Sequence, residues 1–155
     1  MKGNEEIVRH LNARLAEELT AINQYIVHSE MCENWNYGRL HKIIEKRAID
    51  EMKHAEKLIA RILFLEGQPS VSNLNKITIG AEVQKMHMFD RNAEESAIKG
   101  YNESIRLAAE LSDNGTREML EDILKDEESH IDLLEAQLEQ IDQLGLQNYL
   151  VEQID

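Results

Sequence analysis

The sequence predicts an all-α protein: a four-helix bundle with a long crossover between its second and third helices and a short fifth helix at the C-terminus. Composition is the first reason, because the 155 residues include one Pro and seven Gly, and a composition rich in Glu, Leu, Ile, Ala and Lys favours helix over strand. Periodicity is the second, because apolar residues recur every three to four positions through four long stretches. We expect residues 1–155 to form one domain.

The first pair of helices is expected over residues 4–35 and 39–66. Each has an apolar seam of the kind that packs inside a bundle, and each seam contains one glutamate, Glu18 in the first helix and Glu51 in the second. Apolar residues flank Glu18 one turn away on both sides, which is not where a surface glutamate would stand. Pro69 then prevents the second helix from continuing.

The second pair of helices repeats this plan. Residues 70–80 show no long period and are expected to form a crossover loop, which lets the second pair begin at the far end of the first. Helices are then expected over residues 81–112, with Glu94 on the seam, and over 116–143, with Glu127 on the seam.

A fifth, short helix is expected over residues 146–154, because Gly145 interrupts the preceding pattern. A helix of this length is marginal by itself. It must therefore dock on its own subunit or on a neighbouring one.

The charge and composition exclude several partners. A formal net charge of −13 argues against a nucleic-acid groove, which needs clustered Lys and Arg. No apolar run approaches the roughly 20 residues of a membrane span. The single cysteine, Cys32, cannot form an internal disulfide, which suits a reducing compartment. We expect a soluble cytoplasmic protein that contacts neither nucleic acid nor membrane.

The two halves of the chain are related by an interval of 76 residues. Each half carries a glutamate, a tyrosine seven residues later, and a Glu-x-x-His unit 33 residues after the first glutamate. The interval relates Glu18 to Glu94, Tyr25 to Tyr101, Glu51 to Glu127 and His54 to His130.

These residues predict a site for two metal ions. Four ionised carboxylates converging in one core would cost several kcal/mol each if unpaired, whereas two divalent cations would balance their charge. Oxygen-rich ligation with one His per ion suits iron or manganese better than a structural zinc. One Glu-x-x-His unit is common by chance, but two in matched seams are not. The other histidines lack a matched acidic partner and are expected to pack or to lie at the surface: His10, His28, His41 and His87.

Tyr25 and Met52 each allow two interpretations. Tyr25 lies two turns from Glu18 on the same face, so it is interpreted either as a core aromatic bonded to a nearby carboxylate alone or as one that also donates an electron in oxygen chemistry. Tyr101 fits the first interpretation better. Met52 is turned about 100° from Glu51 and lies on the side of Ile49, away from the seam. Spacing alone therefore favours Met52 as a packing residue at a subunit contact over a haem ligand.

The sequence resembles bacterioferritin, the haem-containing bacterial ferritin, over essentially its whole length. The matching stretches are highly specific when taken together. They are Met1–Gly3, Glu18–Tyr25, Ile49–Ala55, Arg61–Gly67, Asp126–Glu128, His130–Asp132 and Gly145–Leu150.

The resemblance implies a ferritin-like fold and a ferroxidase centre. It implies that Glu18 and His54 hold one iron, that Glu94 and His130 hold the other, and that Glu51 and Glu127 bridge them. It further implies oxidation of Fe(II) by O2 or H2O2, with ferric mineral stored inside a hollow shell.

The resemblance also implies partners beyond the single chain. Dimers would share a haem b held by Met52 of both subunits, assemble into a shell of 24 subunits and accept electrons for iron release from a ferredoxin-type reductant. Positions associated with pores in the shell are matched by Asn34, Glu66, Asp132 and Asn148. The chain departs from some members at Lys46, where a His would join Asp50 in an inner-surface iron site.

Two other interpretations of the same residues stay open at this point. One is a di-iron peroxidase or oxygenase that does not store iron, although the chain lacks the cysteine cluster that would favour a peroxidase. The other is a helical assembly protein in which the Glu and His residues are structural or hold an inert metal.

Overall fold

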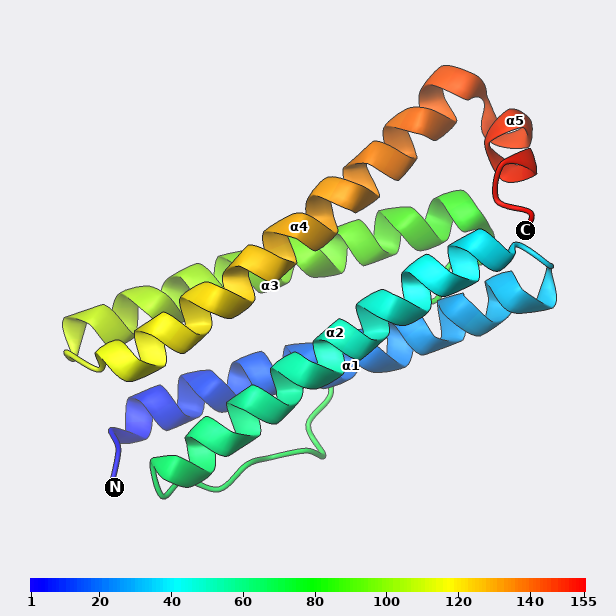
Figure 1. Cartoon of the computed structure of the whole chain (residues 1–155). Helices are drawn as coiled ribbons and strands as arrows, with labels where there is room; N and C mark the ends of the chain where they lie inside the picture. The colour runs from blue at the N-terminus through cyan, green and yellow to red at the C-terminus, as the bar shows by residue number, and fades with distance from the viewer.

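The computed structural model describes residues 1–155 and contains five helices and no strand (Figure 1). The predicted architecture, four long helices with a crossover and a short fifth helix, is confirmed. The fifth helix ends three residues earlier than expected. In chain order the helices are α1 (Glu5–Asn34), α2 (Gly38–Phe64), α3 (Val83–Glu110), α4 (Asn114–Leu144) and α5 (Leu146–Val151).

The long helices form two antiparallel hairpins, α1 with α2 and α3 with α4 (Figure 1). The segment between α2 and α3 runs back along the bundle, so α3 begins at the end where α1 finishes and runs parallel to α2. This is the arrangement that the unpatterned stretch after Pro69 predicted. None of the helices is both long enough and apolar enough to cross a membrane.

Side-chain caps set where two of the helices begin. The Asn4 side chain accepts hydrogen bonds from the backbone N–H groups of Glu6 and Ile7, at 2.8 and 3.3 Å. Asp113 does the same for Thr116 at 3.1 Å, so α4 begins two residues earlier than expected, directly after this cap. Each cap satisfies donors that have no partner within the helix.

The apolar core is divided into two clusters. One gathers around Leu11, Leu58 and Leu120, toward the N-terminal half of α1, and the other around Ile44 and Met86, toward its C-terminal half. The predicted metal ligands lie between these clusters along the helices. The predicted ligands therefore occupy the middle of the bundle, with apolar packing on both sides.

The crossover is attached to α1 by three side chains that lie one turn apart. The backbone N–H groups of Asn75, Thr78 and Gly80 donate to Thr20 Oγ1, Gln24 Oε1 and His28 Nε2, at 2.8, 3.0 and 2.9 Å. A segment without secondary structure of its own is thereby held across the bundle.

His28 continues this attachment into the core. Since its Nε2 accepts from Gly80, its Nδ1 carries the proton and donates to Asp90 Oδ1 at 2.8 Å. Asp90 also accepts from Gln24 and from Arg47, at 2.8 and 2.9 Å, and is fully buried. His28 is thus a buried network residue, a role that helical spacing alone did not reveal.

Helix α5 docks on its own subunit. Tyr149 is buried, and its hydroxyl donates to Gln137 of α4 and accepts from His87 Nε2 of α3 at 3.0 Å. The tail beyond the helix returns to α2, where Gln153 accepts from the Arg39 N–H at 3.1 Å. Of the two docking positions that the sequence left open, its own subunit or a neighbouring one, these contacts show the first.

Candidate metal centre

The structure brings all six predicted ligands together in the middle of the bundle. They form two groups whose donor atoms lie within 4.8 Å of one another, and the two groups share Glu51 and Glu127. The first group adds Glu18 and His54, and the second adds Glu94 and His130. Five of the six are 1 % exposed, and His130 is 8 % exposed.

Each of these residues presents one buried atom that has no hydrogen-bond partner. Buried polar atoms are nearly always paired, and an unpaired one costs about 1–3 kcal/mol. Six such atoms facing one another are explained by a ligand that accepts electron pairs from oxygen and nitrogen, so the residues fit a pair of divalent cations. The atoms are Glu18 Oε2, Glu51 Oε1, His54 Nδ1, Glu94 Oε2, Glu127 Oε1 and His130 Nδ1.

Two aspartates orient the histidines. His54 Nε2 donates to Asp126 Oδ2 at 2.9 Å, and His130 Nε2 donates to Asp50 Oδ2 at 3.1 Å. A carboxylate only accepts, so Nε2 carries the proton and Nδ1 is the atom left to bind a cation. Sequence reasoning did not assign these aspartates to the centre, although the interval of 76 residues relates them as well.

The inner nitrogens lie close to the two glutamates that both groups share. His54 Nδ1 lies 3.0 Å from Glu127 Oε1, and His130 Nδ1 lies 2.8 Å from Glu51 Oε1. Neither contact has the geometry of a hydrogen bond, since these same atoms are without a partner. The atoms therefore converge on shared positions instead of facing each other directly.

The two tyrosines cross between the halves. The Tyr25 hydroxyl of α1 donates to Glu94 Oε1 of α3 at 2.7 Å, and the Tyr101 hydroxyl of α3 donates to Glu18 of α1. The expectation that these aromatics bond to nearby carboxylates is confirmed. Each binds the glutamate of the opposite half, which positions one oxygen of that glutamate and leaves the other for a cation.

Burial and crowding shift the titration of the centre. Burial, with the neighbouring Glu51 charge, raises the pKa of Glu18 well above its usual range. Burial, with the Glu127 charge, raises the pKa of Glu94 to about 7. For His130, burial lowers the pKa, but contacts with Glu127, Glu51 and Glu94 outweigh it and raise the pKa to about 12. The centre without cations therefore retains protons that an incoming metal must displace.

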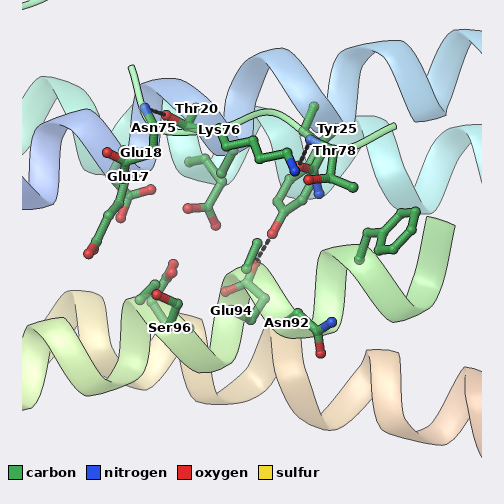
Figure 2. Close-up of a pocket in the computed structure, with 17 residues that line it drawn as sticks. Glu17, Glu18, Thr20, Tyr25, Asn75, Lys76, Thr78, Asn92, Glu94 and Ser96 are labelled. Atoms are coloured by element: carbon green, nitrogen blue, oxygen red, sulfur yellow. Dashed lines mark hydrogen bonds between the residues drawn. The ribbon is translucent and has the colours of Figure 1, made fainter. Parts of the chain in front are cut away.

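A cavity of about 410 Å³ leads to the centre between α1, α3 and the crossover (Figure 2). Its lining includes the buried ligands Glu18 and Glu94 and the exposed residues Asn75 and Asn92. It therefore extends from the protein surface to the ligands. Lys76 is the one cationic residue in the lining.

Arg14 and Glu17 were missed from the sequence. Arg14 is 8 % exposed, although it lies on a helix where an arginine is ordinarily expected at the surface. Its Nη1 donates to Ser104 Oγ at 3.1 Å and its Nη2 to Glu17 Oε1 at 2.9 Å. Burial raises the pKa of Glu17 to about 7. The only sequence signal was a charged pair three residues apart, which is usually a surface feature.

Met52 lies outside the bundle, as its position beside Glu51 predicted. Its side chain is 46 % exposed, and Ile26 of α1 and Ile49 of α2 are exposed as well, while Leu19 and Ile22 are half-buried. The Lys46 ammonium group donates to Asp50 Oδ2 at 3.1 Å. The carboxylate oxygen that an inner-surface iron site would need is therefore already paired with a lysine.

Cys32 is a fully buried thiol in the second apolar cluster. Burial raises the pKa of Cys32 to about 11, so the thiolate is not available as a nucleophile near neutral pH.

Comparison with known proteins agrees with the geometry. The family model described as the ferritin-like domain matches residues 8–144. The bacterioferritin of Rhodobacter capsulatus is 40 % identical over 149 residues, which cover 96 % of this chain and 92 % of that protein. The bacterioferritin of Mycobacterium avium is also 40 % identical over 149 residues (96 % and 94 %), and that of Streptomyces coelicolor is 39 % identical over 150 residues (97 % and 90 %). This chain belongs to the ferritin family and, within it, to the bacterioferritins.

Proposed function

We propose that this protein stores iron: it binds two Fe(II) ions per subunit, oxidises them with O2 or H2O2 and deposits ferric mineral inside a hollow shell of 24 identical subunits. Fe(II) is the substrate of this ferroxidase reaction, and its conversion to Fe(III) supplies the electrons that reduce the oxidant. The protein supplies binding, orientation and a buried environment.

The observation that carries this proposal is the sharing of Glu51 and Glu127 between two ligand groups that each add one Glu and one His. In the proposed centre, Glu18 and His54 bind one iron, Glu94 and His130 bind the other, and the shared glutamates bridge them. Four carboxylates then balance two divalent ions, which removes the cost of burying them unpaired.

The chain's other residues give each ligand a defined state. Asp126 and Asp50 hold the imidazoles with Nδ1 directed inward.

Tyr25 is the proposed electron donor for turnovers that lack a full complement of Fe(II). When the phenol loses an electron to the oxidant, its proton can pass along the 2.7 Å hydrogen bond to Glu94. That transfer yields a neutral phenoxyl and a protonated carboxylate, so charge and protons balance.

Met52 is the proposed axial ligand of a haem b at the two-fold contact between subunits, one thioether coming from each. The exposure of the apolar side chains of Ile26 and Ile49 supports this, because a porphyrin needs an apolar enclosure and a single chain leaves these residues uncovered. The haem would pass electrons from a ferredoxin-type reductant toward the mineral for iron release.

The test of the ferroxidase proposal is rapid mixing of metal-free protein with Fe(II) and O2. We expect the fast oxidation phase in wild type and its loss in Glu127→Ala and His130→Ala. Glu128→Ala is the matched control, since Glu128 is exposed and adjacent to the centre without belonging to it. Equal rates of the fast phase in wild type and in both ligand variants would show that these residues do not form the ferroxidase site. Storage is tested separately by mass and by iron retained per shell, and a dimer that never retains more than its dinuclear iron would refute it.

A further inference from the structure

Glu17 presents a carboxylate oxygen that its surroundings do not use. Its side chain is 18 % exposed, and its Oε1 accepts from Arg14 at 2.9 Å. Its Oε2 is buried and has no hydrogen-bond partner. Glu17 stands next to Glu18 on α1, but it does not belong to either ligand group.

Arg14 holds Glu17 in this position. The guanidinium is held on its other side by Ser104, and it lies directly against Gly100 of α3. A Cβ atom at Gly100 would lie 2.4 Å from Arg14 Cζ, so a side chain at that position would displace the guanidinium. The pair is therefore part of the packed interface between α1 and α3, and it fixes the unused oxygen of Glu17 in one place.

The Glu17 side chain borders the cavity that reaches the metal centre. Glu17 lines that cavity together with Glu18 and Glu94, each of which has an unpartnered oxygen of its own. Exposed Ser96 lines it as well, and Figure 2 shows Glu17 and Glu18 extending from α1 toward α3, where Ser96 and Glu94 lie. An acidic side chain outside both ligand groups thus lines the approach to the ligands.

This carboxylate is present on one side of the centre only. The interval of 76 residues relates Glu17 to Ala93, which lines the same cavity without a ligand atom. The pseudo-symmetry that governs the dinuclear ligands is therefore broken at the approach to them.

We propose that Glu17 is a loading site, at which an incoming Fe(II) ion binds Oε2 before it moves to Glu18 and the dinuclear centre. This inference rests on the proposed function. Because Arg14 shares the carboxylate, Glu17 binds a cation weakly, which is what a transit ligand requires if the ion is to move on. The ion exchanges a water ligand for a carboxylate and then that carboxylate for the next one, with no change of oxidation state.

The test follows the arrival of a divalent ion without any turnover. Co(II) is mixed anaerobically with metal-free protein, and the absorption of Co(II) at the dinuclear centre is followed by stopped flow. We expect Glu17→Gln to slow arrival at low Co(II) on the order of 10-fold, because the cavity loses the charge that concentrates cations. The final Co(II) bound at the dinuclear centre should equal that of wild type. The glutamine keeps an oxygen for the Arg14 hydrogen bond, so the fold is expected to persist.

Glu103→Gln is the matched control, since it removes the same charge from an exposed residue of α3 that does not line the cavity. Arrival in Glu17→Gln as fast as in Glu103→Gln would overturn the proposal. A second measurement needs no variant: crystals of wild type soaked briefly in Co(II) should show anomalous density at Glu17 Oε2, and density at the dinuclear centre alone at every soak time would count against a loading site. Either negative result leaves the ferroxidase proposal standing, because that proposal is decided by Glu127→Ala and His130→Ala.

Discussion

Tyr25 of α1 donates its hydroxyl hydrogen bond to Glu94 of α3 at 2.7 Å, and the 76-residue repeat places the reciprocal bond between Tyr101 and Glu18. The two phenols are not equivalent. The Arg47 guanidinium lies 4.7 Å from the centre of the Tyr25 ring, and Tyr25 lines the cavity, whereas Tyr101 packs in the first apolar cluster. The halves therefore share ligand geometry but differ around their tyrosines.

The first prediction concerns Tyr25 as an electron donor. Tyr25→Phe should abolish a transient tyrosyl radical seen by electron paramagnetic resonance after Fe(II) and O2 are added, and Tyr101→Phe should retain it. Each variant leaves a buried carboxylate oxygen without its donor, so both should lose about 1–3 kcal/mol of unfolding free energy. A radical that disappears in Tyr101→Phe and persists in Tyr25→Phe would show that Tyr101, and not Tyr25, is the electron donor.

The second prediction concerns the aspartates that orient the histidines. Asp126→Ala should weaken divalent metal binding at the His54 site by about 10- to 100-fold, because the imidazole loses the partner that sets its tautomer and orientation. Anaerobic Co(II) titration measures this affinity. Asp122→Ala is the control, as Asp122 is an exposed residue one turn earlier on α4. An unchanged affinity in Asp126→Ala would mean that packing alone orients His54.

The third prediction concerns protons released on metal binding. The pKa of His130 is raised to about 12 and that of Glu94 to about 7, so near pH 7 the metal-free centre holds protons that a cation displaces. Affinity should therefore increase as pH rises. Calorimetric titration in buffers of different ionisation enthalpy measures the number released, and heats independent of buffer would contradict the expected protonation.

The fourth prediction concerns His87 and the docking of α5. Burial, with the nearby Arg47 charge, lowers the pKa of His87 from 6.5 to about 4. Between pH 6.5 and pH 4 the unfolded chain binds a proton at His87 that the folded chain does not bind. The contribution of the neutral His87 side chain to the unfolding free energy is therefore complete above pH 6.5 and is lost as pH falls toward 4. The loss should approach about 3 kcal/mol. Urea unfolding across this range should show the slope in wild type, and His87→Leu should lack that part of it.

The fifth prediction concerns Met52. Met52→Leu should purify without haem absorption and take up none on reconstitution, while the fast phase of Fe(II) oxidation stays at the wild-type rate, because Met52 points away from the dinuclear centre. Met88→Leu is the control, since Met88 is another exposed methionine, on α3. Haem retained in Met52→Leu with unchanged absorption would exclude Met52 as a ligand.

The sequence by itself determined the helices and the six residues that meet in the core. Both depend on short-range order: a helical period shows which face is buried, and a glutamate such as Glu18 inside an apolar seam can be recognised as buried because its neighbours one turn away are buried. The 76-residue interval then related the two halves without any knowledge of how they pack. The outward position of Met52 followed from the same local geometry.

Only the tertiary structure decided which residues meet across helices away from those seams. Asp126 reaches His54 from another helix, and Arg14 occupies the space left by Gly100, whose missing side chain cannot be read as a contact from the sequence. The attachment of the crossover to α1 and the docking of Tyr149 against His87 are likewise contacts between distant segments. Helical period specifies the face on which a side chain lies, but the partner that it meets depends on the register and distance between packed helices, and these are set by the whole core.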